Sequence, residues 1–254
     1  MVSLERDMLT NIVDKDGSVV ETAKLNAAYA SGGAVTAVAT IQQQIGLGID
    51  KYALINMNGL KDLVDAVGGI EVDNKLGETI SIEETEPDYT ATVEPGKQHI
   101  NGDQALVYAR MRHQDPEGDI GRQARQREVL EKIIAKVLSL NGVSNYQKIL
   151  KAVEKNSKTD LTWNEMLDIA TNYYPAFENI EQEQLEGRDE QMNGIYYQIL
   201  GMQELLTVQN SLKEQLELPT NEELTIDPQF EYSYNGFIGN QFYDDRVSET
   251  EETT

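Results

Sequence analysis

Cysteine is absent from this 254-residue chain, and histidine occurs only twice. Without cysteine the chain can form no disulfide, no thiolate metal site and no cysteine nucleophile. Two histidines are too few for a His-rich metal site, and a Ser-His-Asp triad would have to use His99 or His113. We expect His99 to be a surface residue in a turn, whereas His113 could either contact an anion or merely border the neighbouring loop.

Long apolar runs and positive charge are also scarce. No run approaches the roughly 20 apolar residues that a membrane-spanning helix needs, and no signal-peptide pattern follows Met1. Lys and Arg number 21 against 44 Asp and Glu, which gives a formal net charge of -23. Non-specific binding of nucleic acid requires many Lys and Arg to neutralise phosphates, so this charge argues against a nucleic-acid partner.

The few arginines are concentrated in one segment. Of the eight arginines in the chain, five lie between residues 110 and 127: Arg110, Arg112, Arg122, Arg125 and Arg127. The guanidinium group offers a planar fork of donors that matches phosphate and carboxylate oxygens. A cluster of such groups in an acidic protein predicts a local anionic ligand.

A helix with one buried face is predicted in and after this segment. Its apolar residues recur at helical spacing; they are Leu130, Ile133, Ile134, Val137 and Leu138. Extended backwards, the stripe passes through Gln126 and Arg122, so we expect both to point to the same side as the apolar residues. Charged residues on an inward face are costly unless they are paired or line a ligand cavity.

The start of this helix admits two interpretations. Asp119 and Gly121 are expected to open it, so that its positive end lies beside the arginines and favours an anion there. The alternative is a solvated basic helix start, with ion pairs to Asp115, Glu117 and Asp119.

Strands and helices alternate through the first hundred residues, a pattern typical of an α/β fold. Strands expected at 51–57 and 70–72 flank a helix that we expect Asn58 to cap. Residues 74–94 are expected to form an acidic hairpin or surface loop, after which Asn101 caps another helix.

Residues 1–216 are expected to form one domain, closed by a pair of strands at 183–185 and 195–199. Beyond it, residues 217–254 contain ten acidic residues and one basic residue, with no periodic pattern. We expect this acidic tail to be disordered or loosely attached.

The candidate functional residues are mostly strong hydrogen-bond donors. The donors are Arg6, Lys24, Arg110, Arg112, Arg122 and Gln126, and the one candidate carboxylate is Asp7. Such a set suits a pyrophosphate, because phosphoryl transfer depends mainly on positioning and charge neutralisation. It suits a module that binds a carboxylate or sulfate equally well. We expect the arginines and Gln126 to converge with Arg6 on one pocket mouth.

Five ordered blocks form a larger pattern. They are SLERD at 3–7, KLNAAYA at 24–30 with GG at 32–33, NGL at 58–60 leading to VGGI at 67–70, GKQHING at 96–102, and YARMRH at 108–113 followed by 119–126. Together they resemble the catalytic domain of the LytR-CpsA-Psr family, closely over residues 1–140 and in outline to about residue 216.

The resemblance implies both a fold and an activity. The fold is α/β, with a central mixed β-sheet flanked by helices in an αβα sandwich and a hydrophobic lipid pocket. The activity is that of a phosphotransferase at the extracytoplasmic face of the bacterial cell membrane, usually with magnesium. It moves an anionic glycopolymer, such as teichoic acid or capsular polysaccharide, from a polyprenyl-pyrophosphate carrier in the membrane to peptidoglycan.

The resemblance also implies the roles of individual residues. The pyrophosphate ligands by motif position are Arg6, Lys24, Arg110, Arg112, Arg122, Arg125 and Gln126. The catalytic candidates are Arg6, Asp7, Arg110 and Arg112. The prenyl chain is expected to lie against Leu130, Ile133 and Val137.

One departure from the family concerns the metal. In the family, an anchor helix and early strands precede the block at Arg6, and those strands carry aspartates that bind metal. We therefore expect the magnesium ligands upstream of Met1 and assign none within the chain. The alternative functions are a non-catalytic binder of polyprenyl phosphate or wall polymer, and a transcriptional attenuator of the cell envelope.

Overall fold

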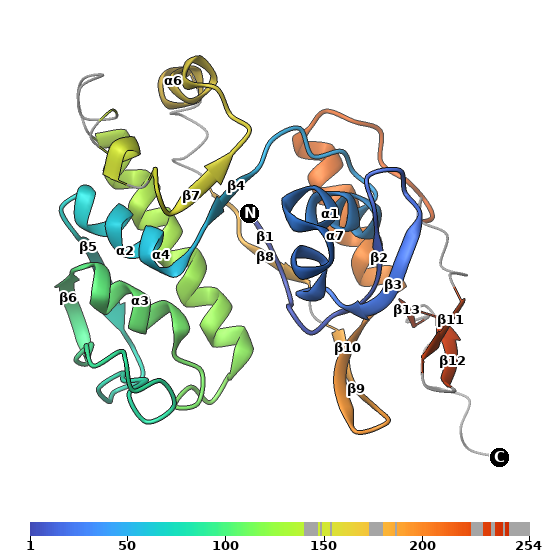
Figure 1. Ribbon diagram of the computed structural model, residues 1–254, viewed down its shortest axis with the longest axis horizontal. Helices are drawn as coiled ribbons and strands as arrows, with labels where there is room; N and C mark the ends of the chain where they lie inside the picture. The colour runs from blue at the N-terminus through green and yellow to red at the C-terminus, as the bar shows by residue number, and fades with distance from the viewer. Residues whose placement is uncertain are drawn as a thin grey trace. The chain divides into compact units, whose positions relative to one another are not determined.

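The computed structural model describes residues 1–139, 147, 149–152, 154–172, 180–185, 187–224, 231–234, 237–240 and 242–243. The chain divides into two compact units, coloured along the sequence in Figure 1 and described separately below. Unit 1 combines Met1–Asp50 with Gln182–Thr254, and unit 2 is the continuous stretch Lys51–Glu181. Two segments that are far apart in the sequence therefore build unit 1.

The first segment of unit 1 is a hairpin followed by a long helix. Strand β2 (Leu9–Val13) is buried throughout and pairs antiparallel with β3 (Val19–Lys24), which leads into helix α1 (Ala27–Ile45). The helix is kinked at Gly32 and Gly33. Gly33 has a φ of 71°, in the left-handed region that glycine adopts most readily.

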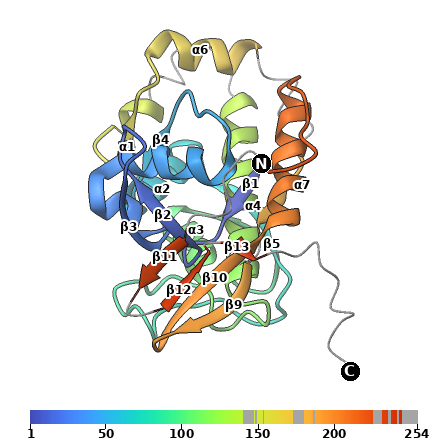
Figure 2. The ribbon, with the colours of Figure 1, turned by 90° about the vertical axis from the view of Figure 1, so that its right-hand side faces the viewer.

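The second segment of unit 1 contributes a hairpin and a helix. Strands β9 (Gly187–Met192) and β10 (Ile195–Gly201) pair antiparallel and lead into α7 (Met202–Gln215), as Figure 2 shows. The two segments are joined where β1 (Val2–Leu4) pairs in parallel with β8 (Glu183–Leu185). The strand pair expected from 183–185 and 195–199 is therefore wrong, because each of these strands has a different partner.

Short strands also occur in the acidic tail. Strand β11 (Glu231–Tyr234) pairs antiparallel with β12 (Phe237–Asn240), and β13 (Phe242–Tyr243) pairs in parallel with β10. The other residues after 224 lie outside the described part of the chain. The expectation of a disordered or loosely attached tail stays a prediction.

The first strand of unit 2 pairs with its last strand. Strand β4 (Ala53–Ile55) pairs antiparallel with β7 (Ser157–Thr159), and helix α2 (Met57–Ala66) follows β4. Helix α6 (Trp163–Asn172) follows β7. Thr162 and Glu165 form the capping pair at its start, with Glu165 Oε2 accepting from Thr162 N at 2.7 Å.

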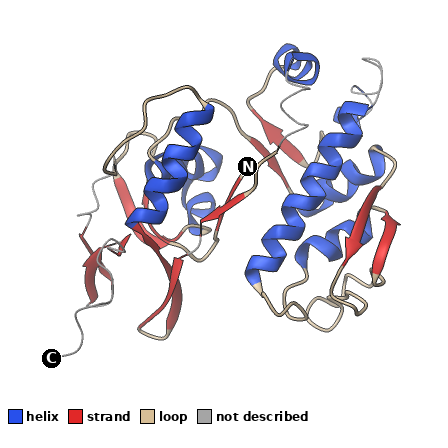
Figure 3. Ribbon diagram, turned by 180° about the vertical axis from the view of Figure 1, so that it is seen from behind, coloured by secondary structure: helices blue, strands red, loops and turns tan. Residues whose placement is uncertain are grey.

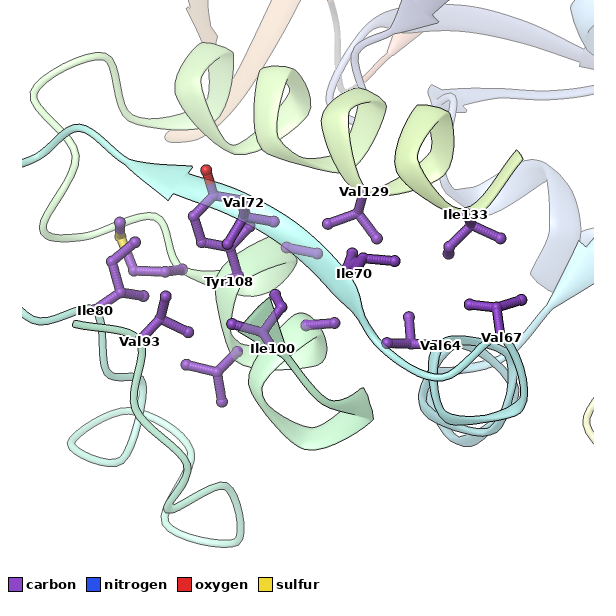
Figure 4. Packing of buried hydrophobic residues seen from close by; sticks show 14 of the residues in the cluster. Val64, Val67, Ile70, Val72, Ile80, Val93, Ile100, Tyr108, Val129 and Ile133 are labelled. Carbon is purple, nitrogen blue, oxygen red and sulfur yellow. The ribbon is translucent and has the colours of Figure 1, made fainter. Parts of the chain in front are cut away.

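The centre of unit 2 is a hairpin packed against two helices. Strands β5 (Ile70–Asn74) and β6 (Gly96–Ile100) pair antiparallel, and the chain continues into α3 (Gly102–Arg110) and α4 (Asp119–Ser139). Figure 4 shows the apolar side chains that these elements contribute to one cluster, among them Ile70, Val72, Ile100, Val129 and Ile133. This cluster packs α3 against α4.

Helix caps show how local sequence sets these boundaries. Asn101 caps α3 as expected, because its side chain accepts from Gln104 N while the Gln104 side chain accepts from Asn101 N. The expectation that Asn58 caps α2 is wrong, since the cap is Asn56, whose Oδ1 accepts from Gly59 N at 2.8 Å. Both positions carry asparagine, and only the extended backbone at Asn56 suits an N-cap.

The buried face of α4 differs from the expected one. Val129 and Ile133 are 2% and 3% exposed and Val137 packs against the same cluster, whereas Leu130 is 45% exposed. Followed backwards at steps of four residues, the buried face reaches Arg125 rather than Gln126, which is exposed. The expected stripe is therefore right for Ile133 and Val137 and wrong for Leu130, which does not face the apolar cluster, and for its extension through Gln126.

The α/β class is confirmed, with parallel and antiparallel strand pairs (Figure 3). The described strands form several sheets of two or three strands, each within a single unit. None of the described helices combines the length and the hydrophobicity that crossing a bilayer demands. A lipid pocket lined by Ile133 and Val137 stays a prediction.

The corrected face of α4 predicts unequal effects of two truncations. Ile133→Ala should lower the free energy of unfolding by about 2–5 kcal/mol, because it leaves a cavity in the cluster. Leu130→Ala should change it by less than about 0.5 kcal/mol, because Leu130 is already largely in water. Urea denaturation followed by circular dichroism measures both, and equal losses would contradict the assignment of the buried face.

Candidate functional site

The arginine segment of unit 2 lies where α3 ends and α4 begins. Helix α3 ends at Arg110, because Met111 leaves the helical conformation with φ -55° and ψ 136°. A turn-rich connection that includes Arg112 leads to Asp119, the first residue of α4. The next arginine, Arg122, lies in the first turn of that helix. Three of the expected pyrophosphate ligands thus belong to one end of unit 2.

Arg125 is the buried arginine of this segment, with 7% exposure. Its Nε donates to the carbonyl oxygen of Tyr108 at 2.9 Å, and its Nη2 donates to the carbonyl oxygen of Met111. Its Nη1 pairs with the carboxylate of Asp115. All three nitrogens have partners within the protein, so Arg125 ties α4 to the end of α3, and its geometry does not support the expected role as a pyrophosphate ligand.

The carboxylate of Asp115 occupies space that is left by the missing side chain of Gly121. A Cβ atom at Gly121 would lie 1.9 Å from Oδ2 of Asp115, so a larger residue there would displace the carboxylate. Asp115 Oδ1 also accepts from the backbone N of Glu117 at 2.8 Å. The two oxygens of this buried carboxylate therefore contact the connection between α3 and α4 at one side and the first turn of α4 at the other.

Tyr108 extends the same network. Its hydroxyl donates to Oε2 of Glu128 at 2.7 Å, and the guanidinium of Arg125 lies 5.9 Å from the centre of its ring. Burial, followed by the hydrogen bond to Glu128, raises the pKa of Tyr108. Its phenol therefore stays neutral and serves the packing between α3 and α4.

Arg110 is held by the loop between β5 and β6. Its Nε donates to Oε1 of Glu86 at 3.1 Å and its Nη2 donates to Oε2, which makes a bidentate ion pair. The guanidinium also lies 5.5 Å from the centre of the Tyr89 ring. The Arg110 side chain remains 28% exposed, so a ligand in solvent can still reach it.

Arg112 and Arg122 share one carboxylate. Oδ1 of Asp119 lies 2.9 Å from Nη2 of Arg122 and 3.9 Å from Nε of Arg112, and Oδ2 accepts from Nε2 of Gln123 at 3.2 Å. The Arg112 side chain is 47% exposed. Of the ion pairs expected for a solvated helix start, those to Asp119 are present, and the one to Asp115 is formed by Arg125 but is buried.

Gln126 contributes a second tie between the two helices. Its Nε2 donates to the carbonyl oxygen of Ala109 at 3.2 Å. The structure therefore brings Gln126, Arg110, Arg112 and Arg122 to the junction of α3 and α4. Arg6 belongs to unit 1, so its expected convergence with these residues stays a prediction.

The candidate residues of unit 1 form a group of their own. Nζ of Lys24 lies 3.0 Å from Oδ1 of Asp7, and Nε of Arg6 lies 3.7 Å from the same oxygen. The ammonium of Lys24 is also 5.8 Å and 5.6 Å from the ring centres of Tyr196 and Tyr197. Asp7 thus holds two cations together, and adjacent aromatic rings flank one of them.

Tyr196 is fixed by hydrogen bonds at its hydroxyl. It donates to Oδ1 of Asp189 at 2.6 Å and accepts from Nε2 of Gln198 at 3.1 Å. Burial and then the bond to Asp189 raise the pKa of Tyr196 to about 12. Tyr196 therefore presents a neutral ring towards Lys24.

The described residues do not fit a magnesium site by themselves. They contain no group of three or more His, Asp or Glu side chains arranged to hold a metal ion. Asp7, the one carboxylate of the candidate set, is already paired with Lys24 and Arg6. His99 is a surface residue as expected, with Nδ1 at 2.8 Å from Oε1 of Glu71, but it lies in strand β6 and not in a turn. His113 is exposed.

Sequence reasoning missed Glu86, Tyr89 and Tyr196, which contact candidate residues. Glu86 lies in the segment 74–94, which the sequence predicts to be an acidic hairpin or surface loop, and 24 residues separate it from Arg110. Tyr196 contacts Lys24, and the two residues come from two segments of unit 1 that are far apart in the sequence. No local sequence pattern predicts either contact.

The network around Arg125 predicts a large and specific loss of stability. Arg125→Met should lower the free energy of unfolding by about 3–5 kcal/mol, because it leaves Asp115 buried without its partner. Arg112→Met, at a largely exposed position, should cost less than about 1 kcal/mol. Adding Asp115→Asn to Arg125→Met should recover part of the loss. Chemical denaturation measures these values, and strictly additive effects of the two substitutions would contradict the pairing.

The surroundings of Tyr196 predict that its phenol ionises at a higher pH than an ordinary tyrosine. Because the pKa of this phenol is raised above its ordinary value of 10.0, the resulting stabilisation is complete below pH 10 and is lost as the pH rises through about 12. Near-ultraviolet titration of the parent and of Tyr196→Phe should differ by one tyrosine that ionises near pH 12. A difference centred near pH 10 would show that the hydrogen bond to Asp189 is not formed.

Comparison with known proteins gives close relatives. Biofilm regulatory protein A of Streptococcus mutans is 49% identical over 221 residues, which cover 86% of this chain and 54% of that protein. The polyisoprenyl-teichoic acid–peptidoglycan teichoic acid transferase TagU of Enterococcus faecalis is 49% identical over 216 residues, 85% of this chain and 67% of that protein. The chain therefore spans about half the length of the first relative and two thirds of the second.

A solved structure and a family model agree with these relatives. The crystal structure of protein gbs0355 from Streptococcus agalactiae superimposes with a TM-score of 0.82 at 48% identity, over 88% of this chain and 76% of that one. The model of the LytR_cpsA_psr family matches residues 1–214. The chain belongs to the LytR-CpsA-Psr family.

Proposed function

We propose that this chain carries the catalytic domain of a phosphotransferase that moves an anionic glycopolymer, such as teichoic acid or capsular polysaccharide, from a polyprenyl-pyrophosphate carrier to peptidoglycan. The observation that carries the proposal is the group of Arg110, Arg112 and Arg122 at the junction of α3 and α4. Membership of the family supports it, and a relative with 49% identity is named as a teichoic acid transferase. The carrier is a membrane lipid, so the proposed place of action is the extracytoplasmic face of the cell membrane.

The reaction breaks the phosphoanhydride bond of the carrier's pyrophosphate and forms a phosphate ester. A hydroxyl group of peptidoglycan attacks the phosphorus that bears the polymer, and the bond from this phosphorus to the bridging oxygen breaks. The polymer becomes linked to peptidoglycan through a phosphodiester, the carrier leaves as polyprenyl phosphate, and the hydroxyl proton passes to a base. Negative charge grows on the leaving phosphate during this step.

The arginines supply what such a transfer requires. Guanidinium groups bind phosphate oxygens through paired donors and neutralise the charge that develops on the leaving group. Arg112 is the most accessible of the three, and Asp119 keeps it close to Arg122. By motif position, Arg6 and Lys24 remain candidate ligands and Asp7 a candidate catalytic residue. Magnesium, which the family resemblance implies, would need ligands beyond the described residues, and no step is assigned to it.

Substitution of one arginine tests the proposal. Arg122→Lys keeps the charge but loses the fork, so it should weaken binding of a polyprenyl pyrophosphate by on the order of 1.5–3 kcal/mol and slow polymer transfer. Arg188→Lys is the control, because Arg188 is exposed in β9 and lies outside the arginine segment. Calorimetry and transfer of a labelled glycopolymer to peptidoglycan fragments provide the measurements.

Three outcomes separate the alternatives. Loss of both binding and transfer in Arg122→Lys, with Arg188→Lys unaffected, would support the proposed phosphotransferase. Tight binding by the parent protein without any transfer would instead indicate a non-catalytic binder of the carrier. Arg122→Lys behaving as Arg188→Lys does would remove Arg122 from the site.

A further inference from the structure

The contacts of Arg110 leave one edge of its guanidinium available. The group carries five N–H donors in one plane. Glu86 occupies the edge formed by Nε and Nη2, and the Tyr89 ring lies near the group. Nη1 has no hydrogen-bond partner among the residues that the structure describes. The edge between Nη1 and Nη2 can therefore accept the two oxygens of a phosphate while the pair with Glu86 persists.

The loop that carries Glu86 and Tyr89 is itself well fixed. The backbone N of Glu86 donates to the carbonyl oxygen of the buried Ile82 at 2.7 Å, and the N of Tyr89 donates to the carbonyl oxygen of Glu86 at 3.0 Å. Tyr89 packs against the apolar cluster of unit 2. Both residues are therefore supported from within unit 2 and are able to hold a long side chain in place.

The same loop is tied to the arginine segment at a second point. Oε1 of Gln114 accepts from the backbone N of Ser81 at 3.1 Å, and its Nε2 donates to the carbonyl oxygen of Thr79 at 3.2 Å. The loop and the connection between α3 and α4 thus meet both at Gln114 and at Arg110. This second contact keeps Glu86 within reach of Arg110.

We propose that Glu86 and Tyr89 are positioning residues that set the orientation of Arg110 for one phosphate of a pyrophosphate ligand. The inference rests on the proposed function and deepens it, because it assigns a role to a carboxylate beside an anion site. Glu86 holds the side edge of the guanidinium, Tyr89 limits its tilt, and the free edge binds the phosphate. A carboxylate that competed with the ligand would instead occupy the edge that the phosphate needs.

Charge and orientation have opposite effects here, so the test must separate them. Glu86→Gln removes a negative charge, which favours an anion, but it also removes the bidentate pair that orients Arg110. Glu84→Gln removes an equal charge two residues away, from an exposed side chain of the same loop. The ratio of the two affinities isolates the effect of orientation.

Calorimetry with farnesyl pyrophosphate at physiological ionic strength measures this ratio on the full chain. We expect Glu86→Gln to bind about three- to tenfold more weakly than Glu84→Gln, because the free arginine must then be ordered by the ligand. Tyr89→Leu should weaken binding to a similar extent, whereas Tyr89→Phe should retain it because the ring remains. Thermal unfolding of each variant shows whether the fold is retained.

A double substitution shows whether Glu86 acts through Arg110. In an Arg110→Lys background, Glu86→Gln should bind no more weakly than Glu84→Gln, because the guanidinium that Glu86 orients is gone and only the equal loss of negative charge remains. A purely structural role would lower affinity equally in both backgrounds and would overturn the inference. An affinity of Glu86→Gln equal to or tighter than that of Glu84→Gln would also overturn it, by showing that the carboxylate competes with the ligand or is irrelevant.

Ligand binding by the parent protein distinguishes failure of this inference from failure of the proposed function. No binding of farnesyl pyrophosphate by the parent would overturn the proposed function and the role of Glu86 together. Binding by the parent that is sensitive to Arg122→Lys, with no difference between the two glutamate variants, would overturn the role of Glu86 alone.

Discussion

The buried guanidinium of Arg125 is the interaction on which the candidate site of unit 2 depends. A helix leaves its last carbonyl groups without intrahelical partners. Here α4 supplies those partners for α3, since Arg125 donates to the carbonyl oxygens of Tyr108 and Met111 and Gln126 donates to that of Ala109. The backbone on both sides of Arg110 is thereby fixed by side chains of the next helix, and the direction in which Arg110 leaves α3 follows from these bonds.

The parts of the fold that local chemistry determines could be predicted from the sequence. The cap at Asn101 depends on residues three positions apart and is present as expected, and the capping pair at Thr162 has the same spacing. Pairing between distant strands could not be derived in this way. Parallel pairing of β1 with β8 joins residues about 180 apart, and no alternation within either strand specifies its partner. The α/β class thus follows from the pattern, whereas the two-unit arrangement does not.

The candidate site was predictable in composition but not in the roles of its members. Clustering of arginines indicated an anion site, yet the helical stripe alone could not choose between faces one residue apart. Leu130 and Val129 are both apolar, and burial of Val129 places Arg125 inside instead of Gln126. The sequence does not distinguish an arginine that donates hydrogen bonds to backbone carbonyls from one that binds a ligand. Only the positions of Asp115 and Glu86 separate the two roles.

Confinement of the arginines to one short segment also governs how an anionic molecule would approach the protein. The whole chain carries a net charge of -23, so its long-range field repels an anionic molecule. At physiological ionic strength this repulsion fades over a Debye length of about 8 Å. At the junction of α3 and α4, carboxylates pair with Arg110, Arg112 and Arg122 and offset much of their charge. Discrimination there therefore depends on directed hydrogen bonds at short range, whereas the acidic surface discourages anions elsewhere.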